Sequence, residues 1–171
     1  MLGEQQEHRT PEEAQRKLGE LIQDVKVAML TTMTDEGHLR SRPMQSVQRH
    51  FDGDLWFFTA HHSGKVEEVQ KEHQVNCAFV DLEKNVYVSV SGLANLVTNR
   101  EKAREYWNPA LKAWFPDGLD DPELALLQVR VEEAEYWDTP TSTFVHIAGF
   151  VKAVATGQTY QPGENEKVNV T

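Results

Sequence analysis

The sequence predicts a mainly β protein of the α+β class, an antiparallel barrel with helices at its periphery. Short apolar runs are separated by tight-turn segments such as "TDEGH", "FDGD" and "EKN", so consecutive strands are expected to pair as hairpins. Helical patterns occur without the regular strand–helix alternation of a parallel sheet. The 171 residues suit one domain with a hydrophobic core. We expect this domain over residues 10–171, after a polar end at 1–9.

The composition restricts the classes of function. No apolar run approaches the roughly 18 residues of a membrane span, and the beginning "MLGEQQEHRTPEEAQ" has no signal-peptide pattern. We therefore expect a cytoplasmic protein. The net charge of −10 argues against binding to nucleic acid or an anionic membrane. Cys77 is the only cysteine, which excludes an internal disulfide and a cysteine-rich zinc site.

The first expected element is a helix in "TPEEAQRKLGELIQDV". Thr10 can cap it, Pro11 suits the first helical position, and Glu13 completes a capping box. Apolar residues recur at helical spacing and form one stripe: Ala14, Leu18, Leu21, Ile22 and Val25.

Five strands and a helix are expected next. "VAMLTTM", residues 38–50 and "LWFFTA" read as three strands, and a short helix runs from Ser63 to about His73. "VNCAFVDL" and "NVYVSVSGLANLV" read as two more. In the last of these, valines alternate with tyrosine and serine, so its two faces should differ.

The second half is predicted to be more mixed. "TNREKAREYW" should be a helix with Thr98 and Glu101 as its capping box. "NPALKAWFPDGLDDPELALL" is expected to form short helical turns and loops, and "LQVRVEEAEYWD" a strand. Residues 141–155 fit a strand pair by composition, but their apolar residues have helical spacing and we favour a helix.

The segment "TAHHSGKVEEV" carries the first candidate site. A helix that starts near Ser63 would present unpaired backbone N–H groups and a positive dipole end, which stabilise anions such as phosphate. Ser63 can donate a hydroxyl, Gly64 permits close approach, and Lys65 adds a full charge. The alternative is an ordinary helix cap with a solvated lysine.

The adjacent His61 and His62 are poor candidates for a metal site. Zinc sites commonly use histidines spaced i, i+4 on a helix or i, i+2 on a strand, and adjacent side chains would tend to diverge. We therefore expect no metal here, and loop polarity or a ligand contact explains the pair.

The strand "HLRSRPM" carries the second candidate site. Arg40, Arg42 and Met44 would share one face, where two arginines repel unless acidic residues or an anionic ligand compensate. Pro43 cannot donate to a sheet, so the strand should lie at an edge. The alternative is a charged edge strand that prevents aggregation.

The third candidate is a group of aromatic residues, Trp107, Trp114 and Phe115, in a segment rich in proline and glycine. They could close over the core, line a subunit interface or cover a planar ligand. One of them would pack in the core by default, but three together favour an interface or the wall of a pocket.

Four motifs in order give the chain a resemblance to a known family: "MLTTMTDEGHLRSRPM", "LWFFTAHHSGKVEEV", "VYVSVSGLA" and "WFPDGLDDPELALLQVRVEEAEYWD". Over about residues 12–157, the chain resembles the general stress protein branch of the pyridoxamine-phosphate-oxidase-like family. The resemblance implies an FMN-binding split β-barrel that works as a homodimer, with its flavin sites at the subunit interface.

The resemblance also implies roles for particular residues. The flavin phosphate and ribityl chain would be held by Phe58, Thr59, Ser63 and Lys65. The strand with Arg42, Pro43 and Met44 would run along the isoalloxazine edge, where Arg42 would face electron-rich ring or phosphate oxygens. The partner would contribute Trp114 and Phe115.

The chain departs from true pyridoxamine phosphate oxidases at two places. It closes with "TYQPGENEKVNVT", without the tryptophan and arginine of their C-terminal segment, and Gly64 stands where oxidases often have arginine. We therefore expect an FMN-binding stress-type protein, a flavin-dependent oxidoreductase with no assignable catalytic residue. The alternatives are a pyridoxamine 5′-phosphate oxidase and a non-enzymatic flavin store or sensor, or a related binder of haem or deazaflavin.

Overall fold

One long strand, β6 (Leu124–Asp138), organises the sheet. The computed structural model describes residues 10–48, 50–138 and 164–170. The other strands of this part of the chain are β1 (Val27–Met33), β2 (Leu39–Gln45), β3 (Asp54–Ala60), β4 (Gln74–Asp81), β5 (Val86–Val97) and β7 (Glu164–Asn169). The helices are α1 (Pro11–Ile22), α2 (Gly64–Lys71) and α3 (Arg100–Tyr106), with 3₁₀ turns η1 (Pro109–Ala113) and η2 (Gly118–Asp120).

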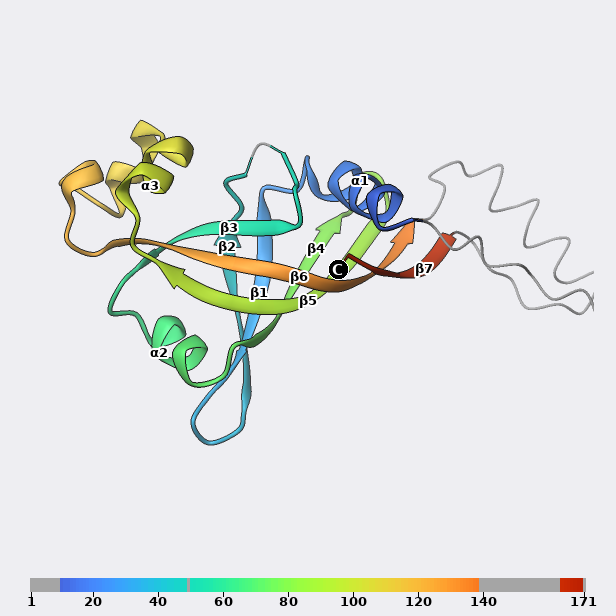
Figure 1. Ribbon diagram of the computed structural model, residues 1–171, viewed down its shortest axis with the longest axis horizontal. Helices are drawn as coiled ribbons and strands as arrows, with labels where there is room; N and C mark the ends of the chain where they lie inside the picture. The colour runs from blue at the N-terminus through green and yellow to red at the C-terminus, as the bar shows by residue number, and fades with distance from the viewer. Residues whose placement is uncertain (1–9, 49, 139–163, 171) are drawn as a thin grey trace, which may run out of the picture.

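The strands form one antiparallel sheet in the order β2-β1-β4-β5-β6-β3 (Figure 1). One edge of β6 pairs with β5, while its other edge is shared by β3 in the first half and β7 in the second. The two end strands meet where Ser46, just after β2, makes a bridge to Phe57 of β3. The sheet is therefore a barrel that closes only partly, which confirms the predicted fold class.

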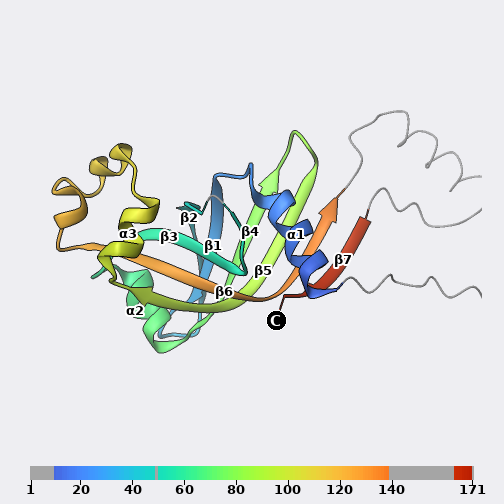
Figure 2. The same ribbon diagram turned by 45° about the horizontal axis from the view of Figure 1, so that its top comes forward.

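Helix α1 covers the main core. Thr10 accepts from the backbone N–H of Glu13, whose carboxylate accepts from the backbone N–H of Thr10, so the predicted capping box is confirmed. Leu18 and Ile22 are buried against the sheet. Figure 2 shows α1 near β5 and β7, while α3 lies at the opposite end of β6.

A second, smaller core lies under α3, η1 and η2. It contains Trp56, Phe115 and Leu126, with Phe58 and Trp107 packed against it. Because Trp56 and Phe58 alternate with the inward residues of β3, this strand is covered on both faces.

Several predicted elements differ from the structure. β2 ends at Gln45, well before residue 50. Asn99 caps α3 by accepting from the backbone N–H of Lys102, so the capping box predicted for Thr98 is wrong; both residue types cap well, and the local spacing does not separate them.

The start of β6 was also predicted wrongly. Residues 124–127 were expected to be turns and loops, but they are strand and all buried. A short run that is apolar on both faces lacks the alternation that identifies a strand. β7 was not predicted, although Glu166, Val168 and Val170 alternate with more exposed residues. The polar end at 1–9 and the helix at 141–155 lie outside the described residues. None of the helices in the described segments is long and apolar enough to cross a membrane.

Candidate functional site

The end of β3 and the start of α2 bring three polar side chains together. The Lys65 ammonium donates to Thr59 Oγ1 at 3.3 Å and to Ser63 Oγ at 3.2 Å, and the two hydroxyl oxygens are 3.3 Å apart. Thr59 is buried, and the other two side chains are half-buried. The structure therefore assembles the three residues that the segment "TAHHSGKVEEV" suggested.

The start of α2 leaves donors available at this place. Ser63 is the N-cap residue, as predicted, but its side chain makes no capping bond and turns to Thr59 and Lys65 instead. In the described part of the chain, no acceptor bonds the backbone N–H groups of Gly64 and Lys65. A methyl group on Gly64 would meet no atom within 4 Å, so the helix start is open to a ligand.

The hydrogen-bond partners of the Lys65 ammonium group are uncharged. No carboxylate among the described residues forms an ion pair with it, and its two partners are hydroxyls. Burial and the charge of Arg42 lower the pKa of Lys65, while Glu68 acts in the opposite direction. An anion would relieve both unfavourable effects.

A buried carboxylate compensates the two arginines of β2. Glu68 Oε2 lies 2.7 Å from Arg42 NH2, and Glu68 Oε1 lies 3.2 Å from Arg40 NH1. Both arginines therefore share one face, as predicted, and the acidic residue that they require comes from α2. Thr32 completes the network by accepting from Arg42 at 2.9 Å and donating to Glu68 at 2.5 Å.

The network determines the charge state of Glu68. Burial by itself would raise the pKa of the carboxyl group, but the hydrogen bonds from Thr32 and Arg42 and the charges of both arginines lower it. Glu68 is therefore an anion at neutral pH, and it sits one helical turn beyond Lys65.

The neighbouring residues of β2 are placed differently. Met44 is buried in the main core, and Pro43 is exposed opposite Met29 of β1. β2 is an end strand of the sheet, as its proline suggested. These positions do not test the predicted contact of Pro43 and Met44 with the isoalloxazine edge.

The aromatic candidates separate into buried and exposed side chains. Phe115 is buried in the second core and packs near Phe58, which also meets Trp107 edge-on with ring centroids 6.0 Å apart. Trp114 is 68% exposed. Phe115 is therefore a core residue, and the exposed ring of Trp114 is available to a ligand or a partner.

The histidines form a small surface cluster. Their rings lie against each other, with centroids 4.5 Å apart, so the expectation that they diverge is wrong. His62 Nδ1 lies 2.8 Å from Glu123 Oε1, because the β3–α2 loop packs beside the start of β6. The described residues contain no group of three or more potential metal ligands that could hold an ion.

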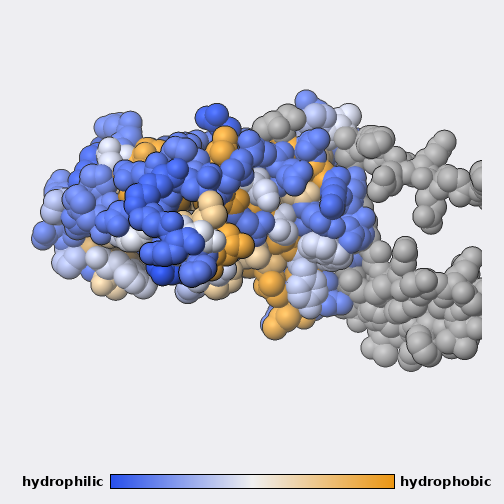
Figure 3. Space-filling view, turned by 90° about the horizontal axis from the view of Figure 1, so that it is seen from below, coloured by the Kyte–Doolittle hydropathy of each residue, from blue (hydrophilic) through white to orange (hydrophobic). Residues whose placement is uncertain are grey.

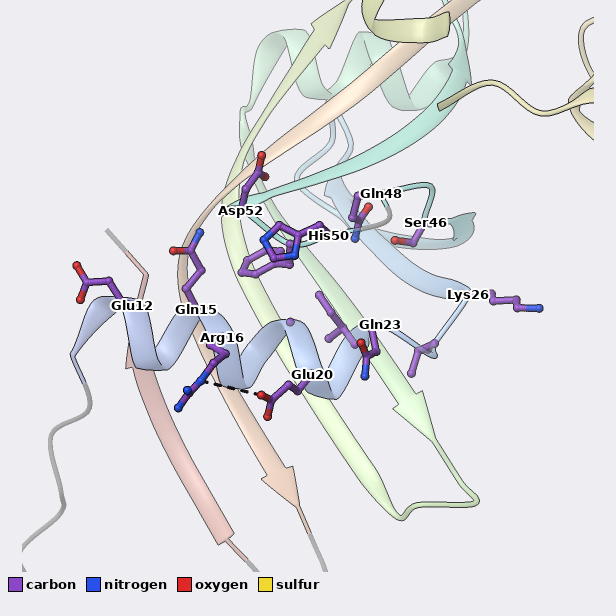
Figure 4. Close-up of a pocket in the computed structure, with 14 residues that line it drawn as sticks. Glu12, Gln15, Arg16, Glu20, Gln23, Lys26, Ser46, Gln48, His50 and Asp52 are labelled. Carbon is purple, nitrogen blue, oxygen red and sulfur yellow. Dashed lines mark ion pairs between the residues drawn. The ribbon is translucent and has the colours of Figure 1, made fainter. Parts of the chain in front are cut away.

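A separate hollow of about 420 Å³ lies between α1 and the connection from β2 to β3 (Figure 4). Its rim mixes acidic, basic and amide side chains, including Gln15, Gln48 and His50. None of the predicted site residues lines it.

Comparison with known proteins identifies the family. The family model described as pyridoxamine 5′-phosphate oxidase like matches residues 13–161. The chain belongs to this family. Protein bli-3 of Neurospora crassa is 32% identical over 78% of this chain and 68% of its own length. General stress protein 26 of Bacillus subtilis is 25% identical over 80% of this chain and 96% of its own.

A solved structure supports the same placement within the pyridoxamine 5′-phosphate oxidase-like family. The general stress FMN/FAD binding protein of Xanthomonas citri is 28% identical, with a TM-score of 0.67 over 77% of this chain and 92% of its own. These relatives place the chain in the general stress protein 26 branch, which confirms the resemblance seen in the four motifs.

The sequence reasoning missed Glu68 and Thr32. It recognised that Arg40 and Arg42 need a counter-charge, but it did not find the residue that supplies one. The available signal was position: Glu68 follows Lys65 by three residues, so a helix places both on one side.

Proposed function

We propose that this member of the pyridoxamine 5′-phosphate oxidase-like family binds FMN, with the phosphate at Lys65. One observation carries the proposal: a half-buried ammonium group is held by Thr59 and Ser63 and has no carboxylate partner among the described residues. A phosphate monoester supplies the missing charge, and its oxygens match the hydroxyl and backbone donors at the start of α2.

The surrounding residues fit a flavin phosphate. Thr59 and Ser63 can reorient their hydroxyls toward an anion, and Gly64 leaves room for the backbone to approach it. Pro43 and Met44 would flank the ring along the end strand, where Arg42 would face electron-rich ring or phosphate oxygens, and Phe58 would lie beside the ribityl chain. The Xanthomonas citri relative is an FMN/FAD binding protein, which supports a flavin as the ligand.

When bound, FMN supplies electron or hydride transfer, and we propose that the protein is a flavin-dependent oxidoreductase of the general stress type. The chain's own part is to hold the phosphate and to orient the ring. None of the described residues at the site is placed as an obvious general acid or base, so we assign no catalytic residue. A cytoplasmic location remains a prediction of the sequence.

We also propose a homodimer with its flavins at the interface. Large apolar side chains are exposed on the outer face of neighbouring strands, and cross-strand pairing places Val80, Tyr87 and Trp137 in one row. Met29 and Met33 extend the exposed set on β1. Figure 3 shows hydrophobic residues among hydrophilic ones on the face seen from below. A second copy would cover them, and Trp114 would reach the partner's flavin.

Absorption spectroscopy of the purified protein, followed by titration of FMN into ligand-free protein, tests the binding. We expect flavin bands or a saturable change in flavin fluorescence; a chain that binds no FMN overturns the proposal. Light scattering of the purified protein tests the dimer. Met29→Lys should yield monomers, whereas Gln23→Lys, which adds the same charge at an exposed position beside the end of α1, serves as the surface control.

A further inference from the structure

Glu68 is a buried anion inside a positively charged site. Its side chain is 9% exposed, and the Arg42 side chain that it contacts is 17% exposed. A carboxylate in such surroundings is stable only when its oxygens are fully bonded. Here Oε2 accepts from Thr32 and Arg42, and Oε1 accepts from Arg40.

These bonds fix the direction of one guanidinium group. NH1 of Arg42 donates to Thr32 and NH2 donates to Glu68, while Thr32 itself donates to Glu68, so the three groups form a closed triangle. A planar guanidinium with two directed bonds cannot rotate freely. Without Glu68, Arg42 would be free to turn away from Lys65, whose like charge repels it.

We propose that Glu68 is a positioning residue that holds Arg42 beside Lys65, so that the phosphate meets two cations rather than one. The proposal rests on the proposed function and adds a residue to its phosphate site. Guanidinium carries five N–H groups, and the described residues use two of those on Arg42. The remaining donors give the arginine capacity for phosphate oxygens.

The alternative role for Glu68 has an effect of opposite sign. If Glu68 only opposed the charge of Arg42, its neutralisation would make the site more positive and would strengthen phosphate binding. If Glu68 positions Arg42, the same change loosens the guanidinium and weakens phosphate binding. The sign of the effect therefore separates the two roles.

The experiment compares FMN with riboflavin, which has the same ring and ribityl chain but no phosphate. The ratio of their dissociation constants measures the contribution of the phosphate alone. In Glu68→Gln we expect this preference for FMN to fall about tenfold, the loss of about one charge-assisted hydrogen bond. Glu67→Gln is the matched control, because it removes the same charge from an exposed neighbour and should leave the preference nearly unchanged.

Two further variants separate positioning from a general loss of structure. Thr32→Val removes one corner of the triangle and should lower the preference less than Glu68→Gln does. In Arg42→Gln the preference should already be low, and adding Glu68→Gln should lower it no further. If Glu68→Gln does not fold, as a thermal melt would show, Thr32→Val decides the matter.

An unchanged or increased preference in Glu68→Gln, or in Thr32→Val where the first does not fold, overturns the positioning role and leaves the FMN site intact. A further fall when Glu68→Gln is added to Arg42→Gln also overturns it. A wild-type protein that binds FMN no better than riboflavin overturns the phosphate site at Lys65 and this inference with it.

Discussion

The ammonium group of Lys65 donates a hydrogen bond, 3.2 Å long, to the hydroxyl of Ser63, the N-cap residue of the same helix. The lysine is thereby folded back over the helix start, where its charge adds to that of the helix dipole. A side chain that would ordinarily extend into solvent becomes part of a concentrated positive site.

Removing this charge should weaken FMN binding selectively. In Lys65→Ala we expect a loss of about 1.5–3 kcal/mol in FMN binding, the range for hydrogen bonds to charged groups, and little change for riboflavin. Fluorescence titration measures both. Lys71→Ala is the control: this lysine lies on the same helix but is exposed and paired with Asp35. An equal loss for riboflavin would show that Lys65 does not contact the phosphate.

Truncation of Trp114 and truncation of Phe115 should affect different properties of the protein. Phe115→Ala removes a buried ring and should cost about 3–5 kcal/mol of the free energy of unfolding. Trp114→Ala changes an exposed side chain and should stay within about 0.5 kcal/mol, while altering the FMN dissociation constant if the partner's tryptophan covers the flavin. Urea unfolding and FMN titration test the pair. Unchanged flavin binding in a folded dimer of Trp114→Ala would remove this residue from the site.

Local patterns in the sequence were sufficient for most of the fold. The capping box of Thr10 is an interaction between near neighbours, and the alternation of valines in β5 is a pattern visible within one strand; the structure confirms both. The run at residues 124–127 defeated the same reasoning, because burial on both faces depends on β3 and the second core, which are remote in sequence. The register of the strands and the closure of the sheet likewise depend on pairing between strands that are remote in sequence.

The candidate site was predictable only where its residues are neighbours in sequence. Thr59, Ser63 and Lys65 lie within one strand end and one helix start, so their grouping followed from the motif. The contact between Arg42 and Glu68 joins residues 26 positions apart. The two neighbouring arginines of β2 required a counter-charge on electrostatic grounds. Only the packing of α2 against β1, which brings α2 beside that face of β2, identifies Glu68 as the residue that supplies it.

Gly92 is expected to be a strict requirement of the sheet. A Cβ at this position would lie 2.1 Å from the backbone oxygen of Arg130, where the pairing of β5 with β6 shifts its register. Because the atoms that this Cβ would meet belong to the backbone of Arg130 and Val131, they cannot turn aside as a side chain can. Gly92→Ala should therefore destabilise the protein by about 1–3 kcal/mol or more. Gly64→Ala, which has open space at its Cβ, should be neutral or stabilise by up to about 1 kcal/mol. Urea unfolding of both variants checks the contrast, and equal effects would contradict it.

Lys65 should make the stability of the ligand-free protein depend on pH. Burial and the charge of Arg42 lower the pKa of Lys65 below the ordinary value for a lysine, and Glu68 opposes them. Between the folded and unfolded pKa values, the unfolded chain binds more protons, so the free energy of unfolding should rise with pH. Lys65→Met lacks this contribution. The free energy of unfolding of Lys65→Met should therefore exceed that of the wild type most at neutral pH, and the difference should shrink as the pH rises through that window.

Urea unfolding of the wild type and Lys65→Met over a series of pH values measures this difference, and the other titrating groups are common to both proteins. A difference that is constant with pH would show that burial does not disfavour the charged form of Lys65. Saturating FMN provides the decisive comparison, because a bound phosphate favours the protonated lysine and raises its pKa. The wild type should then be the more stable protein at neutral pH, and its advantage should be lost as the pH rises through the raised pKa.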